Sequence, residues 1–146
     1  MHFSASLIIG IFFANAFNEP AFTLFGALLG GFFIDGDHLF DHWIVLGIKN
    51  FKLKDFFAGK SFKKSNKVYV LFHGWEYPLL ISFVTFAAVT DKASAAFLIA
   101  FAVSLLAHLI IDTLTNEVKP LGYSVLYRVI HNFDKKHITT KSRRRN

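Results

Sequence analysis

The sequence contains no cysteine, which excludes disulfide bonds and every metal site that depends on thiolate ligands. It is also poor in charge, because charged residues make up 18% of its 146 residues, compared with about 25% in soluble domains. Apolar side chains make up 53% of the chain and include 19 phenylalanines. A chain of this length is expected to form one domain, and this composition is typical of a membrane protein.

Four apolar runs cover most of the chain, and each is expected to be helical. They extend over Phe3–Phe17, Ala21–Ile34, Val68–Thr90 and Ala93–Thr115. The last two are long enough to cross a bilayer core of about 30 Å. The first two are shorter and are expected to form a tilted hairpin, a re-entrant pair or two spans in thinned lipid. Gly26, Gly30 and Gly31 are expected where helices pack closely.

Positive charge is concentrated in two segments. Seven of the 16 lysines and arginines lie from Lys49 to Lys67, and eight follow Thr115. Because the two long runs separate these segments, both lie on one side of the membrane, which the positive-inside rule makes cytoplasmic. We therefore predict an all-α, polytopic membrane bundle of about four apolar helices with both termini cytoplasmic. Residues 1–128 are predicted to be the membrane-embedded domain, and residues 129–146 a basic cytoplasmic tail.

Membrane lipid is the expected partner. The Lys49–Lys67 loop and Arg128 are predicted to attract anionic headgroups, and nucleic acid is not expected to bind. The sequence does not indicate an oligomeric state.

A dense cluster of ionisable residues follows the second apolar run. Asp35, Asp37, His38, Asp41 and His42 lie within eight positions. Few structural needs place three carboxylates and two imidazoles at the end of a hydrophobic segment, and a polyvalent metal is one of them. Oxygen and imidazole donors suit zinc, manganese or iron.

The predicted topology brings other ionisable residues to the same cytoplasmic layer. His73 and Glu76 are three residues apart, as in the Glu-x-x-His pairs of di-metal bundles, and His108 and Asp112 are four apart. Each pair could instead be a structural hydrogen-bonded pair, and Asp35–Asp37 a turn with a helix cap. Their occurrence in one layer favours a centre of one or two divalent ions, with zinc favoured over manganese or iron. The predicted ligands are His2, Asp35, Asp37, His38, His73, His108 and Asp112.

These residues resemble the motifs of the bacterial membrane-bound metal-dependent hydrolases, an inner-membrane family with a LexA-regulated member, related to zinc-dependent phospholipase C. The similar motifs are His2, Gly30-Gly31-x-x-x-Asp35-x-Asp37-His38, Phe72-His73-Gly74-Trp75-Glu76 and His108-x-x-x-Asp112-x-Leu114-Thr115. The resemblance covers roughly residues 2 to 128. It implies a helical fold in the bacterial cytoplasmic membrane, a divalent metal centre and hydrolysis of a phosphoester.

The chain departs from the family pattern at two places. Ile34 stands where many relatives have proline, and Gly74-Trp75-Glu76 follows His73 where many have a second histidine. Glu76 is therefore expected to replace that ligand or to act as a base.

The predicted function is membrane-bound, metal-dependent hydrolysis of a phosphoester in a lipid or lipid-linked substrate at the cytoplasmic interface. Glu76 or Asp41 is predicted to be the general base, with His42 as an orienting residue or additional ligand. A second reading is a transporter of metal ions or protons through the His/Asp cluster. A third is a non-catalytic membrane protein whose basic tail recruits DNA or partners.

Overall fold

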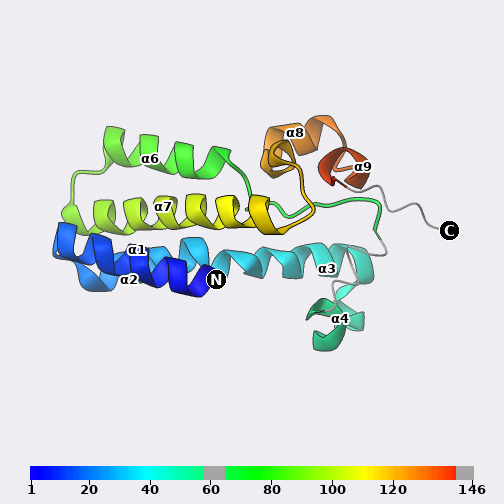
Figure 1. Ribbon diagram of the computed structural model, residues 1–146, viewed down its shortest axis with the longest axis horizontal. Coiled ribbons are helices and arrows are strands. Elements are labelled where there is room, and N and C mark those ends of the chain that lie inside the picture. Colours follow the sequence, from blue (N-terminus) through cyan, green and yellow to red (C-terminus); the bar gives the residue numbers. More distant parts are fainter. Residues whose placement is uncertain (58–64, 141–146) are drawn as a thin grey trace.

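Helix α7, Lys92–Thr115, is the element against which the other long helices pack. The computed structural model describes residues 1–57 and 65–140, so part of the predicted lysine-rich loop and the end of the predicted tail lie outside the described residues. Helices α1 (His2–Phe17) and α2 (Pro20–Gly31) pack on one side of α7, and α6 (Glu76–Ala88) packs on the other (Figure 1). The described residues contain no strand, only isolated bridges, which confirms the all-α prediction.

The α1–α2 hairpin turns through a short polar link. Asn18 ends α1 in the left-handed conformation with a φ of 52°, which asparagine tolerates better than most residues. Pro20 then begins α2, where its missing N–H breaks no helical hydrogen bond.

Close contact between α2 and α7 depends on a small residue. A Cβ atom added to Gly30 would lie 2.3 Å from the backbone oxygen of Phe101. The two helix backbones therefore approach as closely as the sequence predicted for this glycine.

One described helix, α7, is long and apolar enough to cross a membrane by length and composition, and α1, α2 and α6 are shorter apolar helices. The outer face of α6 exposes Leu79, Phe83 and Phe86, spaced three or four residues apart. The four apolar helices were thus predicted, but one of them is shorter than expected.

The prediction of one continuous helix over Val68–Thr90 is wrong. The helix begins only at Glu76, and residues 68–75 form a connector without helical structure. Pro78 lies in the first turn of α6, where proline is tolerated, whereas a longer helix would place its ring against the carbonyl of Gly74.

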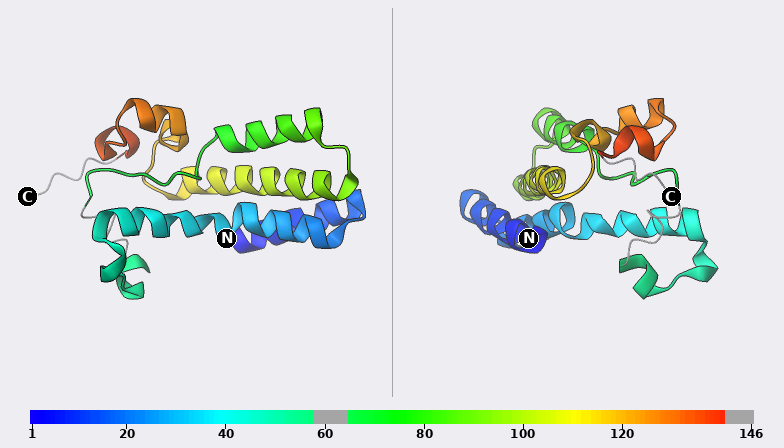
Figure 2. Two further views of the ribbon diagram at one scale, coloured as in Figure 1. Left: turned by 180° about the vertical axis from the view of Figure 1, so that it is seen from behind. Right: turned by 45° about the vertical axis from the view of Figure 1, so that its right-hand side comes forward.

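The shorter helices and turns lie beyond one end of the bundle formed by α1, α2, α6 and α7 (Figure 2). After α2, the chain forms a 3₁₀ turn η1 (Phe33–Asp37), α3 (His38–Leu46), a second 3₁₀ turn η2 (Ile48–Asn50) and α4 (Leu53–Phe57). After α7 come η3 (Pro120–Tyr123), α8 (Val125–Ile130) and α9 (Lys135–Ile138). Figure 2 shows α3 and the connector running beside each other, away from the bundle.

Residues 129–140, assigned to the basic tail on sequence, contain the end of α8 and all of α9. Ile138 of α9 is 1% exposed and packs with Val68 and Val70 of the connector. Backbone bridges join Lys67 to Asp134 and Val118 to Thr139. The connector is therefore held on the side of α8 and α9.

Candidate metal centre

Two groups of possible ligands lie where the start of α1, the end of α2 and the end of α7 meet (Figure 1). The first group is His2, His108 and Asp112, and the second is Asp35, His38 and His73. Within each group, one ligand atom per residue lies within 4.8 Å of the others. His73 comes from the connector, so four separate segments of the chain supply the two groups.

His108 has one ring nitrogen engaged and the other directed at the centre. Its Nδ1 lies 2.9 Å from the backbone oxygen of Gly31, and because a carbonyl only accepts, Nδ1 carries the proton and donates it. Nε2 then presents a lone pair 3.4 Å from Asp112 Oδ2. The other carboxylate oxygen of Asp112 lies 3.3 Å from His2 Nε2, so this carboxylate faces two imidazoles.

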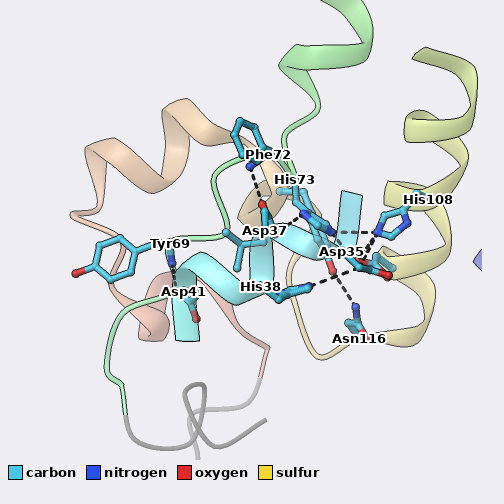
Figure 3. A network of polar contacts seen from close by, with 12 residues as sticks. Asp35, Asp37, His38, Asp41, Tyr69, Phe72, His73, His108 and Asn116 are labelled. Carbon is cyan, nitrogen blue, oxygen red and sulfur yellow. Dashed lines mark hydrogen bonds and ion pairs between the residues drawn. The ribbon is translucent and has the colours of Figure 1, made fainter. Parts of the chain in front are cut away.

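His73 is arranged in the same way from the opposite side. Its Nδ1 faces Asp37 Oδ1 at 3.2 Å, and its Nε2 faces Asp35 Oδ1 at 3.4 Å. The other oxygen of Asp37 accepts a 2.7 Å hydrogen bond from the backbone N–H of Phe72 (Figure 3). Asp37 thus orients the imidazole ring, as a carboxylate commonly does for a metal-bound histidine.

The Nε2 atoms of the two buried histidines lie 3.0 Å apart. With His108 Nδ1 donating to Gly31, the His108 Nε2 lone pair faces His73 Nε2, which can either donate a proton to it or share a cation with it. Ligand atoms around a tetrahedral zinc, each at about 2.0 Å, lie roughly 3.3 Å apart. The separations of 3.0 Å and 3.4 Å among His73, His108 and Asp35 are close to that spacing.

The pKa shifts of His73 and Asp35 both favour the charged form of each group, a positive imidazolium and a negative carboxylate. Burial by itself lowers the pKa of His73, but hydrogen bonding to Asp35 and Asp37 outweighs it and raises the pKa to about 9. Burial likewise favours a higher pKa for Asp35, and the hydrogen bond from His73 and the neighbouring imidazoles bring it below its ordinary value. Burial lowers the pKa of His38, which is therefore suited to present a neutral lone pair.

Six of the seven predicted metal ligands belong to the two groups. The seventh, Asp37, touches His73 from behind and is placed as an orienting carboxylate. The fit of the donor set is therefore good, because the groups offer imidazole and carboxylate atoms with further polar partners behind them.

Glu76 points away from this centre. Its carboxylate accepts hydrogen bonds from Ser124 Oγ at 2.5 Å and from the backbone N–H groups of Val125 and Leu126 at 3.0 Å and 3.2 Å. These donors form the start of α8, so Glu76 caps that helix. In the described part of the chain, Glu76 belongs to neither ligand group.

Asp41 and His42 lie further along α3, outside both groups as far as the chain is described. Asp41 accepts a 3.0 Å hydrogen bond from the backbone N–H of Tyr69, and burial raises its pKa. His42 is fully buried between the rings of Phe51 and Phe56. Neither of its ring nitrogens has a hydrogen-bond partner among the residues described.

Arg128 is a residue whose role the sequence reading assigned wrongly. It was expected to meet lipid headgroups, but it is only 2% exposed. Its guanidinium donates to the backbone oxygens of Tyr69, Val70 and His73. It therefore braces the connector, in which Val70 adopts a φ of 27° that is rare for a β-branched residue. The sequence feature that could have indicated burial is the position of Arg128, alone among the apolar and aromatic residues of 125–130.

A scan of family models, a search of curated proteins and a search of solved structures found no match to this chain.

Proposed function

We propose that the chain is a membrane-bound, metal-dependent hydrolase that cleaves a phosphoester of a lipid or lipid-linked substrate. The convergence of imidazole and carboxylate groups from four segments of the chain carries this proposal, because each of the two groups brings three possible ligand atoms within 4.8 Å of one another. The sequence resemblance to metal-dependent membrane hydrolases supports the reaction class.

One or two divalent ions would be held by the two groups, with zinc favoured by the imidazole-rich donor set. His2, His108 and Asp112 form one set, and Asp35, His38 and His73 form the other. Asp35 Oδ1 also lies 3.4 Å from His108 Nε2, which links the two sets. These residues would hold a divalent ion that, when bound, would supply Lewis-acid chemistry: polarisation of a phosphoryl oxygen and a lower pKa for water.

The chain's own residues shape the approach of the substrate. The side chains of His73 and His108 are almost fully buried, whereas that of Asp35 is 43% exposed and that of His38 28% exposed. A substrate therefore reaches the centre from the side of Asp35 and His38. Hydrolysis adds the hydroxyl of water to phosphorus and its proton to the leaving oxygen.

The exposed apolar faces support a location in the membrane. Leu79, Phe83 and Phe86 would be costly on a water-facing helix, and lipid satisfies them. The distribution of lysines and arginines favours the cytoplasmic side of a bacterial inner membrane for the centre and both termini. A centre at that depth suits a substrate with a phosphate head and an apolar body.

The test measures metal content and phosphoesterase activity of the purified full chain. We expect bound zinc at one or two equivalents, and loss of both metal and activity in the His73→Ala/His108→Ala double variant. His137→Ala, an exposed histidine of α9, is the matched control and is expected to retain both. Full metal content in the double variant would refute the proposed centre.

A further inference from the structure

A groove of about 190 Å³ lies between α3 and the connector. One wall is formed by Asp37, Phe40, Asp41 and Ile44, which follow the i, i+3, i+4, i+7 pattern of one helical face. The other wall is formed by residues 69–72 of the connector. None of these side chains is among the six members of the two ligand groups.

The groove is apolar although two aspartates line it. Asp37 accepts the backbone N–H of Phe72 at 2.7 Å, and Asp41 accepts that of Tyr69 at 3.0 Å. Both carboxylates are thereby turned to the connector backbone, which also fixes the spacing between the two walls. The surface that remains open comes mainly from four apolar side chains, each between 44% and 57% exposed: Phe40, Ile44, Leu71 and Phe72.

The groove borders the candidate metal centre at one residue, Asp37. Asp37 belongs to both, because its Oδ1 faces His73 Nδ1 at 3.2 Å and the residue also lines the groove. Phe72, in the opposite wall, directly precedes His73. A molecule whose head lies at the metal centre therefore has an apolar groove beside the residues that back the centre, Asp37 and Phe72.

We propose that this groove binds the first part of the hydrocarbon chain of an amphiphile whose phosphate lies at the metal centre. The inference rests on the proposed function and assigns the substrate a chain as well as a phosphate. A volume of about 190 Å³ corresponds to roughly six water molecules at about 30 Å³ each. The groove therefore holds a short stretch of chain, and the rest of a long chain continues into lipid.

Photolabelling tests the groove independently of hydrolysis. The full chain, purified in an amphipathic polymer, is irradiated with octyl phosphate carrying a terminal diazirine, and the labelled residues are mapped by mass spectrometry. Labelling is expected to concentrate on residues 40–44 and 69–72. Methyl phosphate in excess is expected to compete poorly, and octyl phosphate well.

Two groove-filling variants and one matched control decide the outcome. Ile44→Trp and Leu71→Trp, from opposite walls, are expected to lose most of the label while keeping the metal content of wild type. Ile48→Trp carries the same substitution as the first variant at a 70% exposed position outside the groove, and it is expected to label normally. Labelling spread over the outer faces of α1 and α6, or unchanged in both groove variants, would overturn the proposal.

A chain-length series separates this inference from the proposed function. Methyl, butyl and hexyl p-nitrophenyl phosphates are hydrolysed to the alkyl phosphate and p-nitrophenol, which reports the rate. In wild type, kcat/KM is expected to rise by up to about fourfold for each methylene that becomes buried, mainly through KM. Ile44→Trp is expected to abolish the rise and to leave the methyl ester unaffected. Equal rates for the methyl and hexyl esters would refute chain binding in the groove but not the proposed function. No hydrolysis of any ester would refute the proposed function, and the labelling experiment would then decide whether the groove binds an alkyl chain.

Discussion

Arg128 Nη2 donates a 2.6 Å hydrogen bond to the backbone oxygen of His73. Arg128, which holds the connector in place, is thus hydrogen-bonded directly to His73, whose imidazole belongs to the candidate metal centre. Its other contacts, to the oxygens of Tyr69 and Val70, extend the brace along the wall of the groove.

Replacing Arg128 with glutamine is expected to destabilise the protein and to weaken metal binding. Hydrogen bonds from a charged donor contribute about 1.5–3 kcal/mol, and the acceptors left behind are buried, so a loss of roughly 3 kcal/mol is expected. Denaturant unfolding and zinc titration of the purified protein measure the two effects. Arg128→Lys should recover part of both, because a lysine retains the charge but not the planar fork. Unchanged zinc affinity in Arg128→Gln would show that the brace does not act on His73.

Gly31→Ala is expected to disturb the orientation of His108. A Cβ atom at Gly31 would lie 2.2 Å from Ser104 Oγ and 2.3 Å from Ser6 Oγ, so the two serines or the Gly31 backbone must shift. The backbone oxygen of Gly31 is the acceptor for His108 Nδ1. Loss of such a supporting contact typically lowers metal affinity by about 10- to 100-fold. Gly36→Ala is the control, since nothing lies within 4 Å of a Cβ there. Equal zinc affinities of the two variants would contradict the proposed orientation.

Removal of the metal by a chelator is expected to lower the thermal stability of wild type. An ion that binds only the folded state at a free concentration a hundred times Kd stabilises it by about 2.7 kcal/mol. The measurement is the melting temperature before chelation, after it, and after zinc is restored. The His73→Ala/His108→Ala variant should show no response to either step, and a response equal to wild type would place the ion elsewhere.

Glu76→Gln is expected to affect stability rather than metal binding. The carboxylate caps α8 through Ser124, Val125 and Leu126, and loss of an N-terminal cap costs about 1 kcal/mol. Ser124→Ala removes the partner hydroxyl, so the two substitutions should be less than additive in a double-mutant cycle. A large fall in kcat with stability unchanged would instead assign Glu76 to the chemistry.

The sequence predicted the convergence of ligands because helix spacing and charge distribution both pointed to one layer. His108 and Asp112, four residues apart on a helix that does form, lie 3.4 Å apart as that spacing requires. The same rule failed for His73 and Glu76, because the chain is not helical at His73 and the two side chains diverge. The apolar composition of this segment could not reveal the late start of the helix, since Val68 and Val70 are buried in the connector as they would be in a helix.

Arg128 was misassigned for a related reason. A basic residue near a lysine- and arginine-rich end is usually exposed, and only the fold shows that the carbonyls of the connector surround it. The carbonyls of Tyr69, Val70 and His73 lack helical partners because α6 begins only at Glu76. The apolar run alone does not show where that helix begins.

The distribution of ligands along the chain has a consequence for biosynthesis. His2 opens the first helix, and its partner Asp112 lies near the end of α7. At about 5–20 residues per second, the ribosome needs on the order of ten seconds to make the stretch between them. The α1–α2 hairpin is therefore complete well before Asp112 is made, and any ion that needs both His2 and Asp112 could bind only late in maturation.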